Sequence, residues 1–437
     1  HAGESMTGKL FGTNVQGQLS RRQFLKRSTT AAAAVTVGSM ALSGSASAAG
    51  ETVALQYFDY GDYGPVGDHW NRIANEASTI SDVGYDAVWI QSPTTPNTNN
   101  SNGYNPKNHF EFESSLGTES ELRDMIGALH NSGVGVYADA VINHTGTDDP
   151  AGGTYPPFPD QSYFHDPYAS DRTTRQLYGL WDLKHEDGRV TNTLHDYADT
   201  LANDLGFDGF RWDAAKHVPK WWFRDYANKW ASDYGMFAVG EVYDGNTDFV
   251  MDYVNTGMNC FDYPLHYTLK SEFAYGGDLS KVADAVRNGN SILGRDPYHA
   301  STFVDNHDDD PPSNRKLAYA FILTAPGYPF VFANHAKPEG VDIDADWLRN
   351  LVWIKKNLAG GDIYFRHDSQ NLLIHERYNN LLAGINQSGS WQSQWVYTSW
   401  RNQTLHDYTG SIDDVWVNGD GWVQISIPPG GWVALAP

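Results

Sequence analysis

The chain contains almost no cysteine and few basic residues. Cys260 is the single cysteine among 437 residues, so no disulfide can form within the chain, and we expect its side chain to be a small buried apolar group. Lys and Arg number 30 against 53 Asp and Glu, which gives a net charge of −23. This charge argues against nucleic acid or an anionic membrane as a partner. It is typical of an ordinary acidic secreted enzyme or of a surface adapted to high salt, and we favour the salt-adapted, halophilic interpretation.

Long hydrophobic runs are also missing. The apolar stretch 31–42 is rich in Ala, Gly and Ser, so it is too short and not hydrophobic enough for a membrane anchor. It follows the twin-arginine pattern SRRQFLK at 20–26 and precedes the cleavage pattern Ala-Ser-Ala at 46–48. Residues 1–49 are therefore predicted to be a signal segment outside the fold. The sequence predicts a secreted, extracellular protein that uses twin-arginine export, and we expect a monomer with no membrane partner.

No glycine-rich dinucleotide fingerprint follows the first strand-like run, which argues against an open doubly wound sheet. Beyond residue 50, β-prone runs alternate with helical runs. Eight such strands indicate a (β/α)8 TIM barrel of the α/β class. The predicted strands are 53–60, 86–91, 135–143, 209–215, 237–243, 259–265, 299–308 and 328–334. The clearest predicted helices are 119–131, 196–205, 221–232 and 345–357.

Two segments depart from this alternation. The connection after the third strand is long and rich in Gly, Pro, Asp and Tyr, which predicts a small inserted domain over 145–190 at the rim of the barrel. Short alternating runs predict a C-terminal antiparallel β-sandwich over 360–437, so the barrel comprises 50–144 and 191–359. We interpret the six tryptophans of the sandwich as core, the alternative being a sugar-stacking surface platform. These are Trp391, Trp395, Trp400, Trp416, Trp422 and Trp432.

Three carboxylates stand where predicted strands end: Asp213 in GFRWDAAKH, Glu241 in FAVGEVYD and Asp308 in STFVDNHD. Parallel strands closed into a barrel bring their carboxyl ends together. Cleavage of an acetal with retention needs a nucleophilic carboxylate and a protonated carboxyl group about 5 Å apart. Arg211 lies two residues before Asp213 and so faces the same side of the strand. Its charge would keep Asp213 ionised while Glu241 stays protonated. An ion-pair network is the purely structural alternative.

Four segments resemble a known family in their order and spacing. Together they are similar to the conserved regions of the α-amylase family, glycoside hydrolase family 13, and the resemblance covers essentially all of residues 50–437. The segments are DAVINH at 139–144, GFRWDAAKH at 209–217, EVYD at 241–244 and FVDNHD at 303–308. The resemblance implies that Asp213 is the nucleophile and Glu241 the general acid/base. Asp308 would bind sugar hydroxyls and stabilise the transition state.

The resemblance also implies substrate contacts outside the three acids. His144 and His307 match histidines that hydrogen-bond the sugar in the cleavage subsite, and Tyr104 matches the tyrosine that stacks on that sugar. Lys216 and His217 match residues that line the neighbouring leaving-group subsite. A lone histidine is more often structural, but His144 and His307 each lie within a matching motif.

Calcium is the cofactor that the resemblance implies. Asn143, Asp182 and the backbone carbonyl of His217 match the family's ligands, although the usual proline before the carboxylate is Trp181 here. Hard oxygen ligands suit Ca²⁺, which would tie the inserted domain to the barrel. Chloride is not predicted, because its basic third ligand is not evident. Other acids of the insert stay open as ligands: Asp160, Asp166 and Asp187.

The family thus implies a secreted, endo-acting α-amylase. It would hydrolyse internal α-1,4 bonds of starch, glycogen and maltodextrins through a covalent glycosyl-enzyme on Asp213, with retained configuration. A maltooligosaccharide-forming exo-hydrolase, a transglycosylase or an α-glucosidase of the same family differs mainly in its rim loops, so these alternatives stay open. A sugar-binding protein that has lost catalysis is disfavoured, because all three carboxylates are present.

Overall fold

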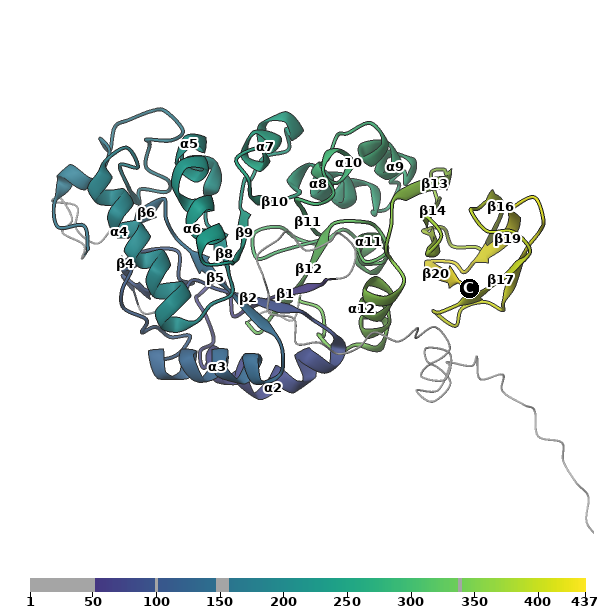
Figure 1. The fold of residues 1–437 in the computed structure, drawn as a ribbon, viewed down its shortest axis with the longest axis horizontal. Coiled ribbons are helices and arrows are strands. Elements are labelled where there is room, and N and C mark those ends of the chain that lie inside the picture. Colours follow the sequence, from purple (N-terminus) through teal and green to yellow (C-terminus); the bar gives the residue numbers. More distant parts are fainter. Residues whose placement is uncertain (1–51, 99–100, 147–156, 337–339) are drawn as a thin grey trace, which may run out of the picture.

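Eight parallel strands close into a barrel at the centre of the molecule (Figure 1). The structure is a computed structural model, and it describes residues 52–98, 101–146, 157–336 and 340–437. The order around the barrel is β1-β12-β11-β10-β9-β8-β5-β2. Each strand overlaps one of the eight predicted runs, so the (β/α)8 barrel is confirmed. The strands are β1 (Ala54–Phe58), β2 (Ala87–Ile90), β5 (Gly135–Ala140), β8 (Gly209–Trp212), β9 (Phe237–Gly240), β10 (Asn259–Phe261), β11 (Ala300–Phe303) and β12 (Tyr328–Asn334).

Helices surround the barrel. The helix predicted over 119–131 is α3. A capping box begins it: the Thr118 hydroxyl accepts from the Glu121 backbone N–H, and the Glu121 carboxylate accepts from the Thr118 backbone N–H. None of the helices in the described part of the chain has the length and apolar character needed to cross a membrane. The helices are α2 (His69–Val83), α3 (Glu119–Asn131), α4 (Gly188–Asp199), α5 (Lys220–Trp222), α6 (Asn228–Asp233), α7 (Thr247–Val254), α8 (Tyr263–Glu272), α9 (Ser280–Arg287), α10 (Ile292–Arg295), α11 (Arg315–Ile322) and α12 (Asp346–Asn357). Single helical turns of 3-10 or π type occur at Gln161–Tyr163, Thr200–Leu205, Ala215–His217 and Phe223–Ala227.

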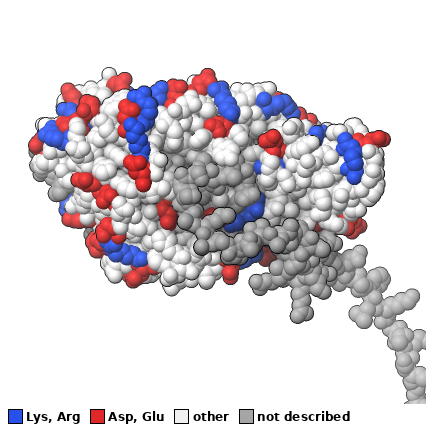
Figure 2. Space-filling model, viewed as in Figure 1, with Lys and Arg blue, Asp and Glu red and all other residues white. Residues whose placement is uncertain are grey.

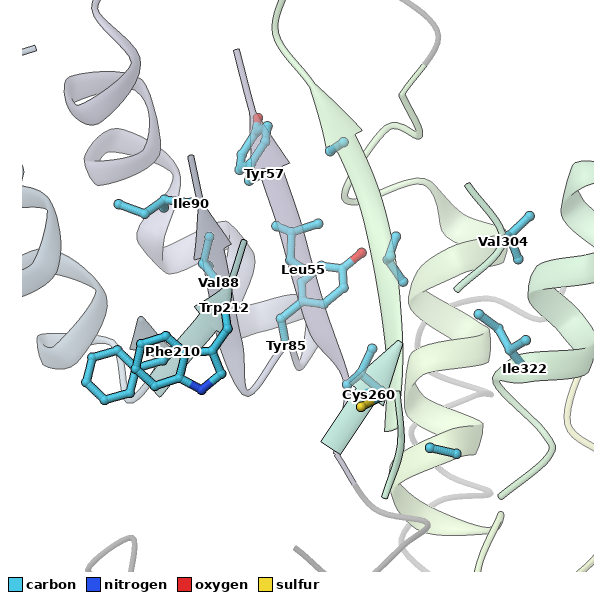
Figure 3. Packing of buried hydrophobic residues seen from close by; sticks show 14 of the residues in the cluster. Leu55, Tyr57, Tyr85, Val88, Ile90, Phe210, Trp212, Cys260, Val304 and Ile322 are labelled. Carbon is cyan, nitrogen blue, oxygen red and sulfur yellow. The ribbon is translucent and has the colours of Figure 1, made fainter. Parts of the chain in front are cut away.

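Side chains alternate between the interior of the barrel and the layer beneath the helices. Aromatic residues such as Trp89, Phe261 and Phe330 fill the interior. Leu55 and Val88 instead join the larger cluster that the helices cover (Figure 3). Cys260 lies in β10 and is fully buried, as predicted.

The chain leaves the barrel after β5. There β6 (His144–Thr145) pairs antiparallel with β7 (Trp181–Asp182), and His144 lies opposite Asp182. A second short pair, β3 (Thr95–Pro96) with β4 (Pro106–Asn108), lies against β6. The chain therefore leaves the barrel where the inserted domain is predicted, but the limits of that domain at 145 and 190 stay predictions. Residues 147–156 and the predicted signal segment 1–49 lie outside the described residues.

The C-terminal part is an antiparallel β domain, which confirms the predicted sandwich. One sheet has six strands in the order β13-β14-β15-β20-β17-β18, and β16 pairs with β19 in a second sheet. Aliphatic side chains fill the space between the sheets. The strands are β13 (Ile363–Asp368), β14 (Leu372–Arg377), β15 (Leu381–Asn386), β16 (Gln392–Tyr397), β17 (Gln403–Asp407), β18 (Val415–Val417), β19 (Trp422–Ile427) and β20 (Gly431–Ala436).

The prediction that the six tryptophans form the sandwich core is wrong for most of them. Four are exposed by 44% to 59%, namely Trp391, Trp395, Trp416 and Trp422. Trp400 and Trp432 are half-buried, and Trp432 packs against Trp347 of the barrel domain with ring centroids 6.3 Å apart. The core is instead aliphatic, because each outward-facing tryptophan of β16 and β19 alternates with an inward-facing valine.

Candidate active site

A cleft of about 610 Å³ is lined by eight of the nine predicted catalytic and substrate-contact residues. Asp213 and Glu241 follow directly after β8 and β9, so both lie at the carboxyl ends of barrel strands. The remaining predicted residues that line this cleft are Tyr104, His144, Lys216, His217, His307 and Asp308. The cleft therefore brings together residues from five separate segments of the chain.

Arg211 lies beneath the cleft and joins three carboxylates. Its Nη1 is 2.7 Å from Asp139 Oδ1 and 2.6 Å from Asp213 Oδ1, and its Nη2 is 2.5 Å from Glu241 Oε1. Arg211 is 1% exposed, and Asp213 and Glu241 are each 7% exposed. The two predicted catalytic acids are thus held on the two arms of one buried guanidinium group.

Burial dominates the acidity of these carboxyl groups, because one cation cannot offset three buried anions. Burial raises the pKa of Asp213 to about 7 and the pKa of Glu241 to about 8, and Arg211 opposes both shifts. Burial also raises the pKa of Asp139 to about 6. Arg211 therefore does not hold Asp213 at its ordinary pKa, as the sequence suggested. Both acids therefore keep a proton to higher pH than an ordinary carboxyl group does.

The backbone after Asp213 connects the two acids directly. Ala214 has a φ of 47°, which a non-glycine residue adopts only under constraint. In this conformation its N–H donates to Glu241 Oε2 at 2.9 Å. The turn that follows the predicted nucleophile thus also orients the predicted acid.

His307 and Asp308 line the same cleft, and their side chains contact each other. Gln56 Nε2 donates to His307 Nδ1 at 3.0 Å, and His307 Nε2 lies 3.2 Å from Asp308 Oδ2. Burial lowers the pKa of His307 to about 4, so the ring is neutral and its Nε2–H donates. The Tyr104 ring stacks on His307 at 5.4 Å, and its hydroxyl donates to Asp139 Oδ2 at 2.7 Å. The side chain of Asp308 is 38% exposed and can meet a ligand from solution.

The other predicted contact residues already have protein partners. His144 Nε2 lies 2.8 Å from the Tyr104 carbonyl oxygen, so a sugar hydroxyl would have to replace this bond. Lys216 Nζ donates to the Tyr243 carbonyl at 2.5 Å, and His217 Nδ1 lies 3.2 Å from the carbonyl of Arg172. All three line the cleft, and their contacts with substrate stay predictions.

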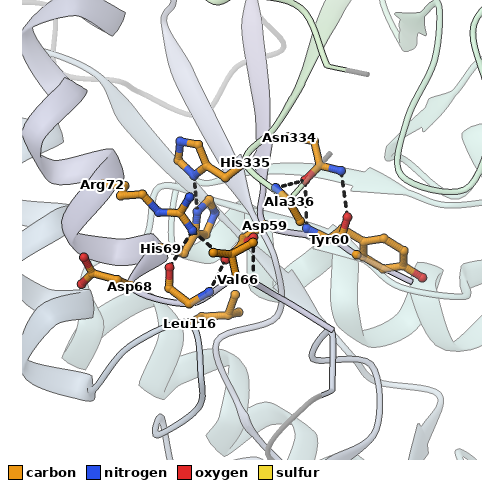
Figure 4. Close-up of polar contacts among 12 residues, drawn as sticks. Asp59, Tyr60, Val66, Asp68, His69, Arg72, Leu116, Asn334, His335 and Ala336 are labelled. Carbon is orange, nitrogen blue, oxygen red and sulfur yellow. Dashed lines mark hydrogen bonds and ion pairs between the residues drawn. The ribbon is translucent and has the colours of Figure 1, made fainter. Parts of the chain in front are cut away.

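A polar network fixes the rim next to Tyr60, a cleft residue that the sequence did not single out (Figure 4). Asn334, at the end of β12, accepts from the Tyr60 backbone N–H at 3.0 Å and donates to its carbonyl at 2.8 Å. Below it, His69 and His335 share a hydrogen bond of 2.9 Å, and Arg72 contacts Asp59 at 2.7 Å. The loop after β1 is therefore tied to β12 and α2, which holds the Tyr60 ring at the cleft.

The predicted calcium ligands include two buried oxygens that lack a partner. In the described part of the chain, Asn143 Oδ1 and Asp182 Oδ1 have no hydrogen-bond partner, while Asp182 Oδ2 is 2.6 Å from His165 Nδ1. The two residues are brought together where Leu183 N–H donates to the Asn143 carbonyl at 3.0 Å. Buried oxygens without partners fit a hard cation. Among the described residues, no group of three or more His, Cys, Asp or Glu could hold a metal, so such an ion would rely on amide and carbonyl oxygens in addition to the Asp182 carboxylate.

Sequence reasoning missed several residues of the site. Asp139 was quoted within a motif but received no role, although it is fully buried against Arg211. Tyr60, Tyr178 and Tyr243 line the cleft, and Tyr178 is 92% exposed. Asp139 could have been found as a carboxylate within an apolar strand, which demands a buried partner. Tyr60 and Tyr243 end predicted strands but lie just beyond β1 and β9, and the sequence gives no sign that these rings line the cleft.

Comparison with known proteins places these features in a family context. The model for "Alpha amylase, catalytic domain" matches residues 52–174, and "Alpha-amylase C-terminal" matches residues 381–434. A glucan 1,4-alpha-maltohexaosidase from Bacillus sp. (strain 707) is 28% identical over 87% of this chain and 91% of its own length. An alpha-amylase from Bacillus licheniformis is 27% identical over 87% of this chain and 92% of its own.

Solved structures show the same architecture. The alpha-amylase from Geobacillus thermoleovorans, solved with acarbose, superposes with a TM-score of 0.76 at 21% identity over 88% of this chain and 97% of that one. This likeness concerns the fold alone. The chain thus matches α-amylase catalytic and C-terminal domains, and these matches and the curated relatives support an α-amylase-like glycoside hydrolase.

Proposed function

We propose that the protein is an endo-acting, retaining α-1,4-glucan hydrolase that cleaves starch, glycogen and maltodextrins. The observation that carries this proposal is the shared contact of Asp213 and Glu241 with Arg211 in a cleft that Asp308 also lines. Two carboxyl groups on the arms of one guanidinium group are close, as retention requires. Burial raises the pKa of both groups, which allows one of them to hold a proton near neutral pH while the other is ionised.

In the first step, an ionised Asp213 oxygen attacks the anomeric carbon of the bound sugar. The bond from this carbon to the glycosidic oxygen breaks, and Glu241 gives its proton to that oxygen. The product with the new hydroxyl leaves, and the remaining sugar is an ester of Asp213. The neutral His307 and the exposed Asp308 carboxylate face the cleft and would bind hydroxyls as positive charge develops on the ring.

In the second step, Glu241 is a carboxylate and accepts a proton from a water molecule. The water oxygen attacks the anomeric carbon, the ester bond to Asp213 breaks, and Glu241 regains its proton. Two inversions give net retention. Arg211 stays cationic throughout and stabilises whichever of the two acids carries the negative charge.

We propose that Asn143, Asp182 and the His217 carbonyl hold Ca²⁺. The support is the pair of buried oxygens without partners and their place between the insert and the barrel. When bound, the ion would supply positive charge that ties the excursion after β5 to the cleft wall. The insert also has direct ties to the barrel, since Arg172 contacts Tyr253 at 2.9 Å and donates to the Lys216 carbonyl.

The nucleophile is tested by Asp213→Asn, with Asp252→Asn as a matched control. Asp252 is an exposed carboxylate on α7 that pairs with Lys220 at 2.6 Å, away from the cleft lining. Release of reducing ends from soluble starch should fall by about a thousandfold or more in the first variant and stay unchanged in the second. Near-full activity of Asp213→Asn would overturn the assignment. Proton NMR of fresh products should show the α-anomer first, and the β-anomer first would contradict retention.

The product pattern separates endo attack from the alternative within the same family. The relative named glucan 1,4-alpha-maltohexaosidase makes a maltooligosaccharide-forming enzyme the second candidate. A time course on soluble starch should give mixed oligosaccharides early if attack is internal. One dominant product from the start would favour the second candidate.

We further propose that the enzyme is secreted through the signal segment predicted at 1–49, acts as a monomer and tolerates high salt. The support is the twin-arginine pattern and the net charge of −23. On the face shown in Figure 2, acidic and basic side chains are mixed and form no single large patch. An exported form whose N-terminus does not lie shortly after Ala48 would contradict the processing site. Loss of activity in molar salt would contradict the adaptation.

A further inference from the structure

The outward face of the β16–β19 sheet carries exposed aromatic residues in a fixed register. Tyr397 pairs with Trp422 and Trp395 pairs with Gln424 across the two antiparallel strands. Trp395 is 54% exposed, Trp422 44% and Tyr397 41%. Because side chains alternate along a strand, these residues share one face while Val396 and Val423 point into the sandwich core. Figure 1 places these two strands at the outer end of the C-terminal domain, away from the barrel.

The rest of this face is polar but uncharged. Ser393 and Ser426 lie opposite each other with their hydroxyl oxygens 2.7 Å apart, and Gln424 is exposed. Neither strand contains a charged residue, although the chain carries 53 acidic and 30 basic side chains. Two strands without charge on such an acidic protein suit a neutral partner that offers both apolar surface and hydroxyl groups.

Two arginines beside the strands hold Tyr397 in place. The Arg401 guanidinium carbon lies 4.8 Å from the Tyr397 ring centroid, and that of Arg366 lies 5.6 Å from it. Arg366 is paired with Glu376 at 2.6 Å, and Arg401 donates to the Thr398 carbonyl at 2.8 Å. Both cations are therefore satisfied by the protein itself.

The indole rings have fewer contacts than Tyr397. Trp422 meets the edge of Tyr397, with ring centroids 5.9 Å apart. Trp395 has no ring or cation partner in the part of the chain that the structure describes. Exposed indole faces next to hydroxyl and amide groups match the alternating C–H faces and hydroxyl edges of a pyranose chain.

We propose that this face, defined by Trp395, Trp422, Ser393, Gln424 and Ser426, is a second binding site for α-glucan polymer. The choice of glucan as ligand rests on the proposed function. The face lies outside the cleft, whose lining comes from the barrel and the excursion after β5. A polymer bound at both places gains effective concentration at the cleft, whereas a short oligosaccharide cannot span them. The site thus acts on polymeric substrate only.

The test uses the Trp395→Ala/Trp422→Ala double variant, with Tyr275→Ala as a matched loss of an exposed ring on the barrel domain. Binding is measured by native electrophoresis through gels with amylopectin, in an Asp213→Asn background so that the polymer stays intact. The dissociation constant for amylopectin should rise by about tenfold or more in the double variant and stay unchanged in the control. Thermal unfolding should be nearly unaffected, since both rings are exposed.

Activity of the same substitutions in the active enzyme keeps the two proposals apart. Cleavage of maltoheptaose should match wild type, while cleavage of granular starch should fall several-fold. Absence of maltoheptaose cleavage in the wild type would contradict the proposed function. The gel electrophoresis with amylopectin would still decide whether the second site exists. Equal retardation of double variant and wild type, or equal retardation by a β-glucan gel, would overturn the second site. A change from dimer to monomer in light scattering, with unchanged retardation, would assign the face to a second copy and also overturn it.

Discussion

Replacement of Arg211 by Gln removes the one cation that contacts three buried carboxyl groups in the described part of the chain. Asp139, Asp213 and Glu241 lie within 2.5 to 2.7 Å of its guanidinium group. Burial already raises the pKa of Asp213 to about 7, and Arg211 lowers it toward its ordinary value. Without the cation, the pKa of Asp213 should rise further. Because the nucleophile must be ionised, the acidic limb of activity should move to higher pH.

The size of the shift follows from the contact geometry. Removing one partner of a buried ion pair costs about 3–5 kcal/mol when the other charge stays ionised. The carboxyl groups can avoid most of this cost by taking up protons, and each unit of pKa shift corresponds to about 1.4 kcal/mol. We therefore expect the acidic limb to move by about one pH unit or more. At pH 6, kcat/KM should fall by about tenfold from this shift alone, in addition to any loss of positioning.

The assay is kcat/KM from pH 5 to 9 on a chromogenic maltooligosaccharide, with thermal unfolding at each pH. Arg211→Lys is the matched control: it keeps the charge, so its acidic limb should move less than that of Arg211→Gln. The loss of melting temperature in Arg211→Gln should grow as pH rises, since more carboxyl groups then need a counter-charge. A lower but unshifted pH profile in Arg211→Gln would refute the electrostatic reasoning and leave Arg211 as a positioning residue.

Two further outcomes follow from the same site. In the folded protein the pKa of Glu241 is about 8, above its ordinary value. The contribution of the protonated group to the free energy of unfolding is therefore present at low pH and is lost as the pH rises through that pKa. Glu241→Gln, which stays neutral, should therefore melt higher than wild type at pH 9 and nearly the same at pH 4; a lower melting point at pH 9 would contradict the buried charge. Addition of a chelator should lower the melting temperature of wild type but not of an Asn143→Ala/Asp182→Ala variant, and equal effects on both proteins would remove the calcium assignment.

The barrel could be predicted because its strands are buried on both faces and read as continuous apolar runs between helical segments. The limits of α3 were also predictable, since Thr118 and Glu121 form a capping box. The face that each tryptophan of the sandwich occupies was not predictable. In β16 the sequence QSQWVY places Trp395 and Val396 on opposite faces, and both are apolar. Only the packing of the second sheet decides that the valine is inside.

The placement of two candidate carboxylates could be predicted, because Asp213 and Glu241 directly follow β8 and β9 and parallel strands in a barrel share one end. Asp308 instead lies in the loop after β11, beyond the end of that strand at Phe303. The pairing of Asp139 with Arg211 could not be predicted. Asp139 and Arg211 are 72 residues apart in sequence and become neighbours only through the register of β5 with β8. The sequence therefore suggested one cation acting on one nucleophile, whereas the structure has one cation shared by three acids. That sharing is why burial, more than Arg211, decides the pKa of Asp213.

The charge balance of the cleft also constrains the proposed catalytic cycle. If Asp139 and Asp213 are ionised and Glu241 is protonated, Arg211 leaves one net negative charge in the buried group. Formation of the glycosyl ester removes the charge of Asp213, but transfer of the Glu241 proton creates a new one on the other arm of the same guanidinium group. The net charge beside Arg211 is therefore the same before and after each step. A site that keeps its charge constant needs little reorganisation of its surroundings, which is the condition under which fixed dipoles and cations are most effective in catalysis.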